Sequence, residues 1–391
     1  MSERRNKCIQ KIQEANIDAV VVATGATLQY LSECNNYFWQ RSCMNNIMGF
    51  SSAKNLPESI LYLDTQGNLV VFAIPRIKDQ FEDNKVVVSY MDQFEDAMAP
   101  YIKAKKIAVG IDCNQYLKDT LKEVNKDIEV IDGADELFFE LRAIKDEKEI
   151  EQMTKLAKFT DEAVMYVVKN LKEGMTQYEA EMMLMQYGFD HGIQDFSFPP
   201  TAGFKTRNTF TPEESFDFPR DTKLVPGTAI AFDVGYMDKG YCSDWGRTVY
   251  FGKAPEHVKN GYKALQKAQQ YMVSKIVPYQ TKVSDLYDLI LEEVERCGYA
   301  DVLRYKNEKM LGHQIGIDCH EFPMINPQYN EVLKPGMIFC SEPKMMFENE
   351  CYMRVEDMIL VTQDGAIFLS NFDRDLFEIQ RRKHGQTITG Y

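Results

Sequence analysis

Two pairs of carboxylates lie in apolar, strand-like segments of this chain, and each pair spans a predicted β-hairpin. Asp233 and Asp244 form the first pair, in the segment AIAFDVGYMDKGYCSDWGRT. A two-residue turn at Asp238 and Lys239 places these two acids directly opposite each other. Opposed residues have Cβ atoms about 4.5–5.5 Å apart, and like charges at that separation destabilise a sheet.

Glu342 and Glu356 form the second pair, in the segment GMIFCSEPKMMFENECYMRVEDMILV. A loop centred on Asn349 places them opposite each other. Burying a carboxylate without compensation is costly, and a cation shared by the acids removes the cost. The two pairs therefore predict a site for two metal ions. The alternative is that each acid lies on a solvated face, which the apolar setting disfavours.

A histidine in a glycine-rich segment adds a nitrogen donor to the four acids. His313 and His320 lie in LGHQIGIDCHEFP, and Gly312 and Gly316 flank the first of them. Glycine permits a close backbone approach and unusual φ values. Four carboxylates and one imidazole make an oxygen-rich set, which suits manganese, cobalt, iron or zinc and differs from a structural zinc site built from thiolates.

Composition argues against several classes of partner and location. The formal net charge is −14, which disfavours nucleic acid and anionic membranes as partners. We find no run of 18 apolar residues and no apolar secretory core at the start. The nine cysteines lack a CxxC motif, which indicates reduced thiols and a cytoplasmic protein. Cys242, Cys319 and Cys340 lie near proposed ligands but are not predicted to be ligands.

Two domains are expected along the 391 residues. Residues 1–140 alternate helix and strand signals and include a hairpin that turns at Gln66 and Gly67. This α/β domain contains no histidine and only scattered acids, so no chemistry is assigned to it. Residues 146–381 form the second domain, which holds both carboxylate pairs.

The second domain is predicted to repeat one order of elements. Asp146 caps a first helix, and Thr176 with Glu179 forms a capping box for the next. Another helix is expected at 257–276, and Ser284 is expected to cap a fourth. Helix, helix and strands thus occur twice. This order predicts two pseudo-twofold halves that each supply one carboxylate pair to a central site.

The order Asp, Asp, His, Glu, Glu resembles that of the pita-bread metallohydrolases, which include methionine aminopeptidase, aminopeptidase P, prolidase and creatinase. The strings GYCSDWGRT, GHQIGIDCHE, PGMIFCSEP and RVEDMILVT are similar to the motifs of that family and follow its order. The resemblance implies an α/β (α+β) protein with a C-terminal pita-bread domain. Residues 1–140 resemble the smaller N-terminal domain of the prolidase, aminopeptidase P and creatinase branch, which methionine aminopeptidases lack.

The resemblance also implies a role for each ligand. Asp233 binds one metal ion through both oxygens, and Asp244 and Glu356 bridge the two ions. His313 and Glu342 bind the other ion. A water between the ions becomes hydroxide near neutral pH and attacks the scissile carbon.

Three side chains are expected to act during the reaction. Glu342 moves a proton from the nucleophile to the leaving nitrogen, and His320 stabilises the tetrahedral oxyanion. Arg354 matches an arginine of the aminopeptidase P-like members, where it contacts a bridging carboxylate or the substrate. The alternative for Arg354 is a structural role around the ligands. No context supports a role for the remaining histidines, which are His191, His257 and His384.

Two departures from the family pattern concern the substrate pocket. The family carries another histidine upstream of the first aspartate, and the corresponding stretch here, near Phe216, has none. Lys344 stands where the family has the glycine of Glu-Pro-Gly. Lys344, with Arg207 or Arg220, would bind a substrate carboxylate, and the alternative for each is a surface charge.

The implied function is a two-metal hydrolase that cleaves peptide bonds to proline, like an Xaa-Pro dipeptidase or aminopeptidase. The expected substrate is a dipeptide or small molecule, and the expected assembly is a homodimer. The cofactors are two divalent ions, with manganese as the first choice and cobalt, zinc or iron as alternatives. Two other functions stay open. One is a non-peptidase enzyme of the same fold, either a C–N hydrolase like creatinase or ectoine hydrolase or a dimethylsulfoniopropionate lyase-like enzyme. The other is a non-catalytic binding module.

Overall fold

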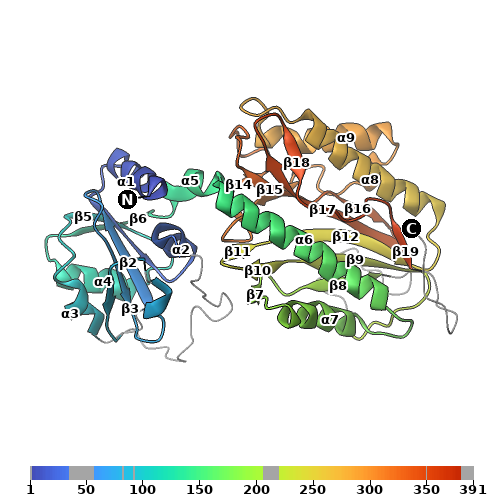
Figure 1. Cartoon of the computed structure of the whole chain (residues 1–391). Helices are drawn as coiled ribbons and strands as arrows, with labels where there is room; N and C mark the ends of the chain where they lie inside the picture. The colour runs from blue at the N-terminus through green and yellow to red at the C-terminus, as the bar shows by residue number, and fades with distance from the viewer. Residues whose placement is uncertain are drawn as a thin grey trace. The chain divides into compact units, whose positions relative to one another are not determined.

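The computed structural model describes residues 2–34, 57–81, 83–90, 93–205, 220–348 and 350–379. The chain divides into two units, Met1–Arg142 and Ala143–Tyr391 (Figure 1). Within the described ranges, no helix is both long enough and apolar enough to cross a membrane.

The first unit is built on a six-stranded mixed sheet with the order β4-β3-β2-β1-β5-β6. The predicted hairpin at Gln66 is confirmed by the antiparallel pairing of β2 with β3. Apolar side chains of α3 and α4 pack against β1, β2, β3 and β5. The elements are α1 (Glu3–Glu14), β1 (Ala19–Ala23), α2 (Ala26–Ser32), β2 (Ser59–Asp64), β3 (Leu69–Ala73), β4 (Val86–Val88), α3 (Phe94–Met98), β5 (Lys106–Val109), α4 (Gln115–Val124), β6 (Glu129–Asp132) and α5 (Phe139–Ala143).

The described residues of the second unit form four longer helices, a small sheet of order β11-β10-β7 and a large, mainly antiparallel sheet. Its helices are α6 (Glu147–Asn170), α7 (Gln177–Asp190), α8 (Glu256–Lys275) and α9 (Leu286–Arg296). Its strands are β7 (Asp195–Phe196), β8 (Thr201–Lys205), β9 (Thr228–Val234), β10 (Tyr236–Asp238), β11 (Tyr241–Cys242), β12 (Trp245–Phe251), β13 (Gly312–Gln314), β14 (Glu321–Ile325), β15 (Ile338–Ser341), β16 (Lys344–Phe347), β17 (Cys351–Val361), β18 (Ala366–Phe368) and β19 (Phe377–Ile379).

The large sheet of the second unit is organised about its centre. β12 and β17 pair there, β9 and β15 flank them, and β8 and β13 follow on either side. Two helices precede each set of strands in the chain, α6 and α7 before β8 and α8 and α9 before β13 (Figure 1). The predicted pseudo-twofold order of helix, helix and strands is confirmed.

Three of the predicted helix caps can be compared with the structure. Asp146 caps α6, and Thr176 with Glu179 forms the capping box of α7, as predicted. The prediction for Ser284 is wrong, because a 3₁₀ turn over Val283–Asp285 precedes α9. Ser284 lies inside this turn and therefore cannot have the extended backbone of a cap.

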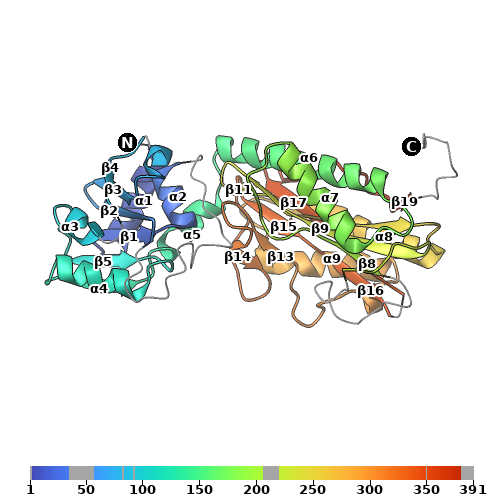
Figure 2. The same ribbon diagram turned by 90° about the horizontal axis from the view of Figure 1, so that it is seen from below.

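Two apolar cores lie between these helices and the large sheet. One packs α6 and α7 against β8, β9 and β12, and the other packs α8 and α9 against β15 and β17 (Figure 2). Phe232 and Val355 belong to these cores. Successive side chains of a strand point to opposite faces, so Asp233 and Glu356 project from the face away from the helices. The carboxylates are thereby gathered on one face.

Candidate metal centre

The hairpin that carries Asp233 has a different register from the predicted one. Lys239 and Gly240 form its turn with φ values of 48° and 76°, and a type I′ turn needs positive φ at both positions. Asp233 therefore pairs with Gly246, and the predicted direct opposition to Asp244 is wrong. Moving the turn by one residue moves the partner by two. Asp244 consequently remains a diagonal neighbour of Asp233 on the same side.

The second hairpin has the predicted register. β17 pairs with β15 before Glu342 and with β16 after it, and both pairings are centred on position 349. Glu342 therefore lies across from Glu356. Asn349 itself lies outside the described residues.

Gly246 joins the two hairpins at the centre of the sheet. It pairs with Asp233 on one side and with Glu356 on the other. A Cβ atom at this position would lie 2.5 Å from Cδ of Arg354 and 2.9 Å from Cβ of Glu356, closer than side-chain atoms tolerate. The absence of a side chain at Gly246 thus gives Arg354 and Glu356 room, and no sequence pattern singled this residue out.

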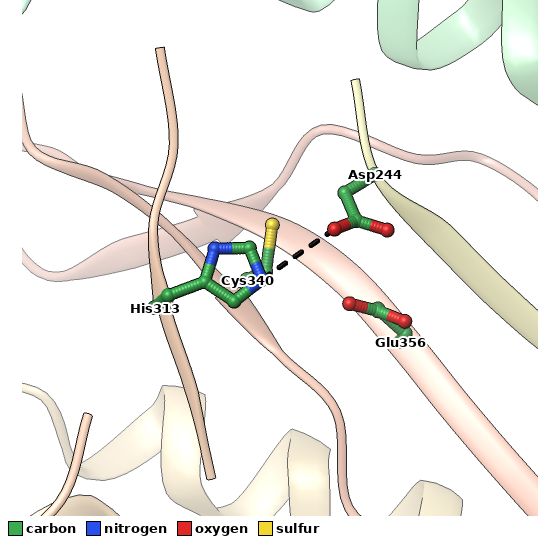
Figure 3. Close-up of side chains that lie close together, drawn as sticks. All are labelled: Asp244, His313, Cys340 and Glu356. Carbon is green, nitrogen blue, oxygen red and sulfur yellow. Dashed lines mark ion pairs between the residues drawn. The ribbon is translucent and has the colours of Figure 1, made fainter. Parts of the chain in front are cut away.

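Four buried side chains offer donor atoms that all lie within 4.8 Å of one another, namely Asp244, His313, Cys340 and Glu356 (Figure 3). Nε2 of His313 lies 3.4 Å from Oδ2 of Asp244. Nδ1 of the same ring donates to the carbonyl oxygen of Gln314 at 3.0 Å. A hydrogen bond from Nδ1 leaves Nε2 as the nitrogen that can bind a metal ion.

The acids of this group have the properties of metal ligands. Oδ1 of Asp244 and Oε2 of Glu356 are buried, and no donor among the described residues makes a hydrogen bond to them. Buried polar atoms of folded proteins are almost always partnered. Burial, with the charges of Asp244 and Glu342 nearby, raises the pKa of Glu356 well above its usual range. A divalent cation would favour the ionised form of these carboxylates and would be coordinated by their oxygens.

Arg354 lies beside the group and contacts two acids. Its Nη1 pairs with Oδ2 of Asp233 and lies 3.5 Å from Oε2 of Glu356. Burial raises the pKa of Asp233, and the guanidinium of Arg354 opposes that rise. Arg354 therefore contacts one of the two carboxylates proposed as bridging ligands.

Glu342 is paired with a lysine. Nζ of Lys344 lies 2.8 Å from Oε2 of Glu342, and the Lys344 side chain is only 9% exposed. Lys344 is therefore not a surface charge. Burial opposes ionisation of Glu342, but Lys344 and Arg354 outweigh it and lower the pKa of Glu342 to about 2. The four-donor group thus contains three of the five proposed ligands, while Asp233 and Glu342 pair with cationic side chains.

His320 lies next to His313, with the two ring centroids 4.0 Å apart. Burial of its ring and the neighbouring His313 lower the pKa of His320, although part of the side chain reaches solvent. The loop that carries His320 is held by Glu321, whose Oε1 accepts the Ile317 N–H at 3.0 Å. Oε2 of Glu321 pairs with Nζ of Lys145 at 3.0 Å. This contact fixes the loop at one edge of the centre.

The other candidates lie outside the four-donor group. His191 follows α7 and stacks on a tyrosine, and His257 pairs with Glu350 at 2.7 Å. Arg220 pairs with Glu181 at 3.3 Å. The candidates that lie outside the described residues are Arg207, Phe216 and His384.

Cys340 is the member of the group that the sequence analysis set aside. It pairs with His313 across β13 and β15, so both side chains share a face. The spacing of two between Cys340 and Glu342 was a usable signal, because residues two apart in a strand point the same way. The other two cysteines make different contacts. Sγ of Cys319 donates to Oδ2 of Asp244 at 3.3 Å, and Sγ of Cys242 donates to a backbone carbonyl.

Comparison with known proteins agrees with this geometry. The chain is 29% identical to an uncharacterized peptidase of Staphylococcus epidermidis over 63% of this chain and 68% of that protein. It is 24% identical to the Xaa-Pro dipeptidase of Pyrococcus furiosus, over 96% of this chain and all of that one. The solved structure of a dipeptidase from Pyrococcus horikoshii OT3 has a TM-score of 0.80 at 21% identity, and covers 96% of this chain and 100% of that one.

The solved structures share the fold along nearly the whole chain, which confirms the resemblance to the pita-bread enzymes with an N-terminal domain. Residues 151–363 match the model of metallopeptidase family M24. This segment contains every proposed metal ligand. The chain belongs to metallopeptidase family M24.

Proposed function

We propose that this enzyme is a two-metal hydrolase that cleaves peptide bonds to proline, as an Xaa-Pro dipeptidase or aminopeptidase does. The observation that carries the proposal is the buried group of Asp244, His313 and Glu356, in a chain of which 96% matches an Xaa-Pro dipeptidase. Facing carboxylates that each keep one buried oxygen without a hydrogen-bond donor favour a bound cation, and hydrolysis of an amide needs an activated water.

In this proposal five side chains hold two divalent ions: Asp233, Asp244, His313, Glu342 and Glu356. Oδ1 of Asp244 and Oε2 of Glu356 are buried and accept no hydrogen bond from a described residue, which supports the proposal that both acids would be shared by the two ions. With oxygen and nitrogen donors alone, manganese is the first choice, and cobalt, zinc or iron are the alternatives. When bound, the ions supply Lewis-acid activation of the scissile carbonyl and of the attacking water.

The protein side chains move the proton and stabilise charge. Glu342 accepts the proton of the attacking water and passes it to the leaving nitrogen. The ammonium of Lys344, 2.8 Å away, favours the ionised carboxylate, which is the state that accepts a proton. His320 lies beside His313 and donates a hydrogen bond to the oxyanion of the tetrahedral intermediate. Arg354 holds Asp233 and Glu356 in place.

A second function remains a candidate because the substrate side of the site departs from the family pattern. Lys344 contacts Glu342, and the stretch near Phe216 has no histidine. These differences favour a substrate other than a standard Xaa-Pro dipeptide. The candidate is a hydrolase of C–N bonds in small molecules, or a lyase of the same fold.

A panel assay separates these functions. Metal-loaded protein is incubated with Xaa-Pro dipeptides and with small C–N compounds, and Glu342→Gln serves as the control for contaminating peptidases. We expect release of free proline at a modest rate. One missing hydrogen bond to the substrate costs about 1–3 kcal/mol, which is roughly a ten- to two-hundred-fold deficit in kcat/KM.

Two results of the panel count against the peptidase. Turnover of a small non-peptide without cleavage of any dipeptide supports the second function. Retained metal without turnover of either class supports a binding module.

The homodimer and the cytoplasmic location also stay proposals. All eight cysteines that the structure describes are free, which suits a reducing compartment. Light scattering tests the assembly, because one chain has a mass of 45.2 kDa and a dimer twice that. A mass of one chain at micromolar concentration would rule out a stable dimer.

A further inference from the structure

We infer that Cys340 is a metal ligand that acts with Asp244, His313 and Glu356, and that its thiol makes the centre selective for zinc or cobalt over manganese. The inference rests on the proposed metal centre and names a donor that the five-residue set lacks. It assigns a coordination role to a side chain with none in the proposed reaction.

The four donor atoms are arranged closely enough for one ion. All lie within 4.8 Å of one another, and Figure 3 shows the thiol, the imidazole and the two carboxylates around a common space. With Zn–S bonds of about 2.3 Å and Zn–N or Zn–O bonds of about 2.0–2.2 Å, the donors of a tetrahedral site lie roughly 3.3–3.7 Å apart. Side-chain movements of about 1 Å therefore close the group around an ion.

The sheet fixes Cys340 in this position. Cys340 on β15 pairs with His313 on β13, and β15 pairs in turn with β17, which carries Glu356. Side chains opposite each other on adjacent strands share a face. Cys340 and Glu356 are 0% and 1% exposed. The thiol thus faces the acids from a central strand.

The acids of the group give independent evidence of a ligand. Oδ1 of Asp244 and Oε2 of Glu356 are buried, and no described residue donates a hydrogen bond to them. Asp244 is 4% exposed. Both residues contribute to the group that includes Cys340. A cation at the centre of the group would bind Oδ1 of Asp244 and would add to the 3.5 Å contact that Arg354 makes with Oε2 of Glu356.

The pairing of Glu342 explains why a thiol is needed. The resemblance assigns Glu342 to the ion bound by His313, but Glu342 contacts Lys344 at 2.8 Å and is not a member of the four-donor group. A carboxylate paired with an ammonium donates less well to a metal ion. Cys340 adds a sulfur donor to the ion that His313 binds, and Glu342 keeps its place in the five-residue centre.

A thiolate changes which ion the centre prefers. The thiol releases its proton to solvent when the metal–sulfur bond forms. Soft sulfur ligands favour zinc and similar ions, whereas manganese prefers carboxylate, carbonyl and water oxygens. The centre should therefore bind zinc or cobalt more tightly, relative to manganese, than a site with oxygen and nitrogen donors alone.

Cobalt(II) absorption tests the bond directly. The cobalt-loaded wild-type protein should show the near-ultraviolet charge-transfer absorption of a thiolate–cobalt bond. Cys340→Ser should lose this absorption while retaining the circular dichroism of the folded protein. Cys242→Ser is the matched control, because the Cys242 thiol is buried but donates to a backbone carbonyl. Absorption that survives Cys340→Ser and disappears in Cys319→Ser would overturn the assignment.

Two measurements extend the test. X-ray absorption of the zinc-loaded wild-type protein should show a sulfur scatterer at about 2.3 Å and needs no variant. In competition experiments, Cys340→Ser should lose at least about tenfold in zinc affinity, since even loss of an outer partner costs about 10–100-fold. Manganese prefers oxygen donors and should lose less, so the zinc-to-manganese affinity ratio should fall. An unchanged ratio contradicts the selectivity.

The outcomes distinguish this inference from the proposed function. Bound metal without a sulfur scatterer and without the charge-transfer absorption overturns only the role of Cys340 and leaves the five-residue centre standing. Failure of the wild-type protein to bind zinc or cobalt at all overturns both.

Discussion

At the level of single residues, the acids of the centre differ in what balances their charge. Lys344 balances Glu342, and Arg354 balances Asp233. Asp244 and Glu356 retain buried oxygens for which no described residue supplies a hydrogen bond. Glu356 has only a 3.5 Å contact with Arg354, which also pairs with Asp233. A poorly compensated buried charge is costly, so a cation is most favourable at these two acids.

Replacing Glu342 by Gln tests its role in proton transfer. The amide keeps the shape of the side chain but cannot accept a proton at neutral pH, so the variant should fold and lose most turnover. Metal content is measured together with the rate, because Glu342 is also a proposed ligand. Wild-type turnover at full metal occupancy would show that Glu342 is not the general acid and base.

Replacing His320 by Ala tests the oxyanion contact. Loss of one such donor lowers kcat by about 10²–10³-fold. Metal content should be almost unchanged, because His320 is outside the four-donor group. Loss of metal in this variant would mean that His320 is a ligand and that the roles assigned to the two histidines are wrong.

At the level of elements, the buried pair of Lys145 and Glu321 holds the loop that carries His320. Their side chains are 1% and 4% exposed. Lys145→Met leaves Glu321 buried without its ammonium partner, and breaking a buried pair in this way costs about 3–5 kcal/mol. Urea denaturation measures the loss.

An exposed ion pair provides the matched control for Lys145→Met. Lys155 and Glu151 pair on the surface of α6 at 2.6 Å. Lys155→Met should cost less than about 1 kcal/mol, since solvent screens exposed pairs. Equal losses in the two variants would show that the Lys145 pair contributes no more than a surface pair.

The two hairpins show what the sequence predicts well and where it falls short. The second hairpin was predicted in the correct register. Its two apolar strands are separated by one polar segment, so the position of the loop fixes the register. The first was wrong by one turn residue. The positive φ values of a two-residue hairpin favour glycine in the turn, and placing the turn at Lys239 and Gly240 would have corrected it.

The candidate site was predictable for its acids and for His313, but not for their partners. Hairpin spacing placed Glu342 across from Glu356 correctly, and it placed Asp233 and Asp244 on the same side of the sheet but not directly opposite each other. It does not predict that Lys344 pairs with Glu342 or that Cys340 lies beside His313, because these contacts depend on side-chain orientations and on pairing between β13 and β15. The role of Gly246 depends equally on three strands meeting at one point.

At the level of the whole molecule, the proposed metal centre would join the two halves of the large sheet. Asp244 belongs to the first half, and His313 and Glu356 belong to the second. An ion bound by all three stabilises the folded state by about 2.7 kcal/mol when its concentration is a hundred times Kd. Calorimetry should show a Tm lower by about 5–10 °C after chelation. An unchanged Tm would indicate that the halves do not share an ion.

The number of metal ions bound per chain tests the central claim of a two-metal centre most directly. Elemental analysis of the metal-replete wild-type protein should give two ions. Asp244→Ala removes a proposed bridging ligand, so the number of ions bound per chain should fall below that of the wild type. Two ions in both proteins would contradict the bridging role of Asp244, and no more than trace metal in the wild type would contradict the centre itself.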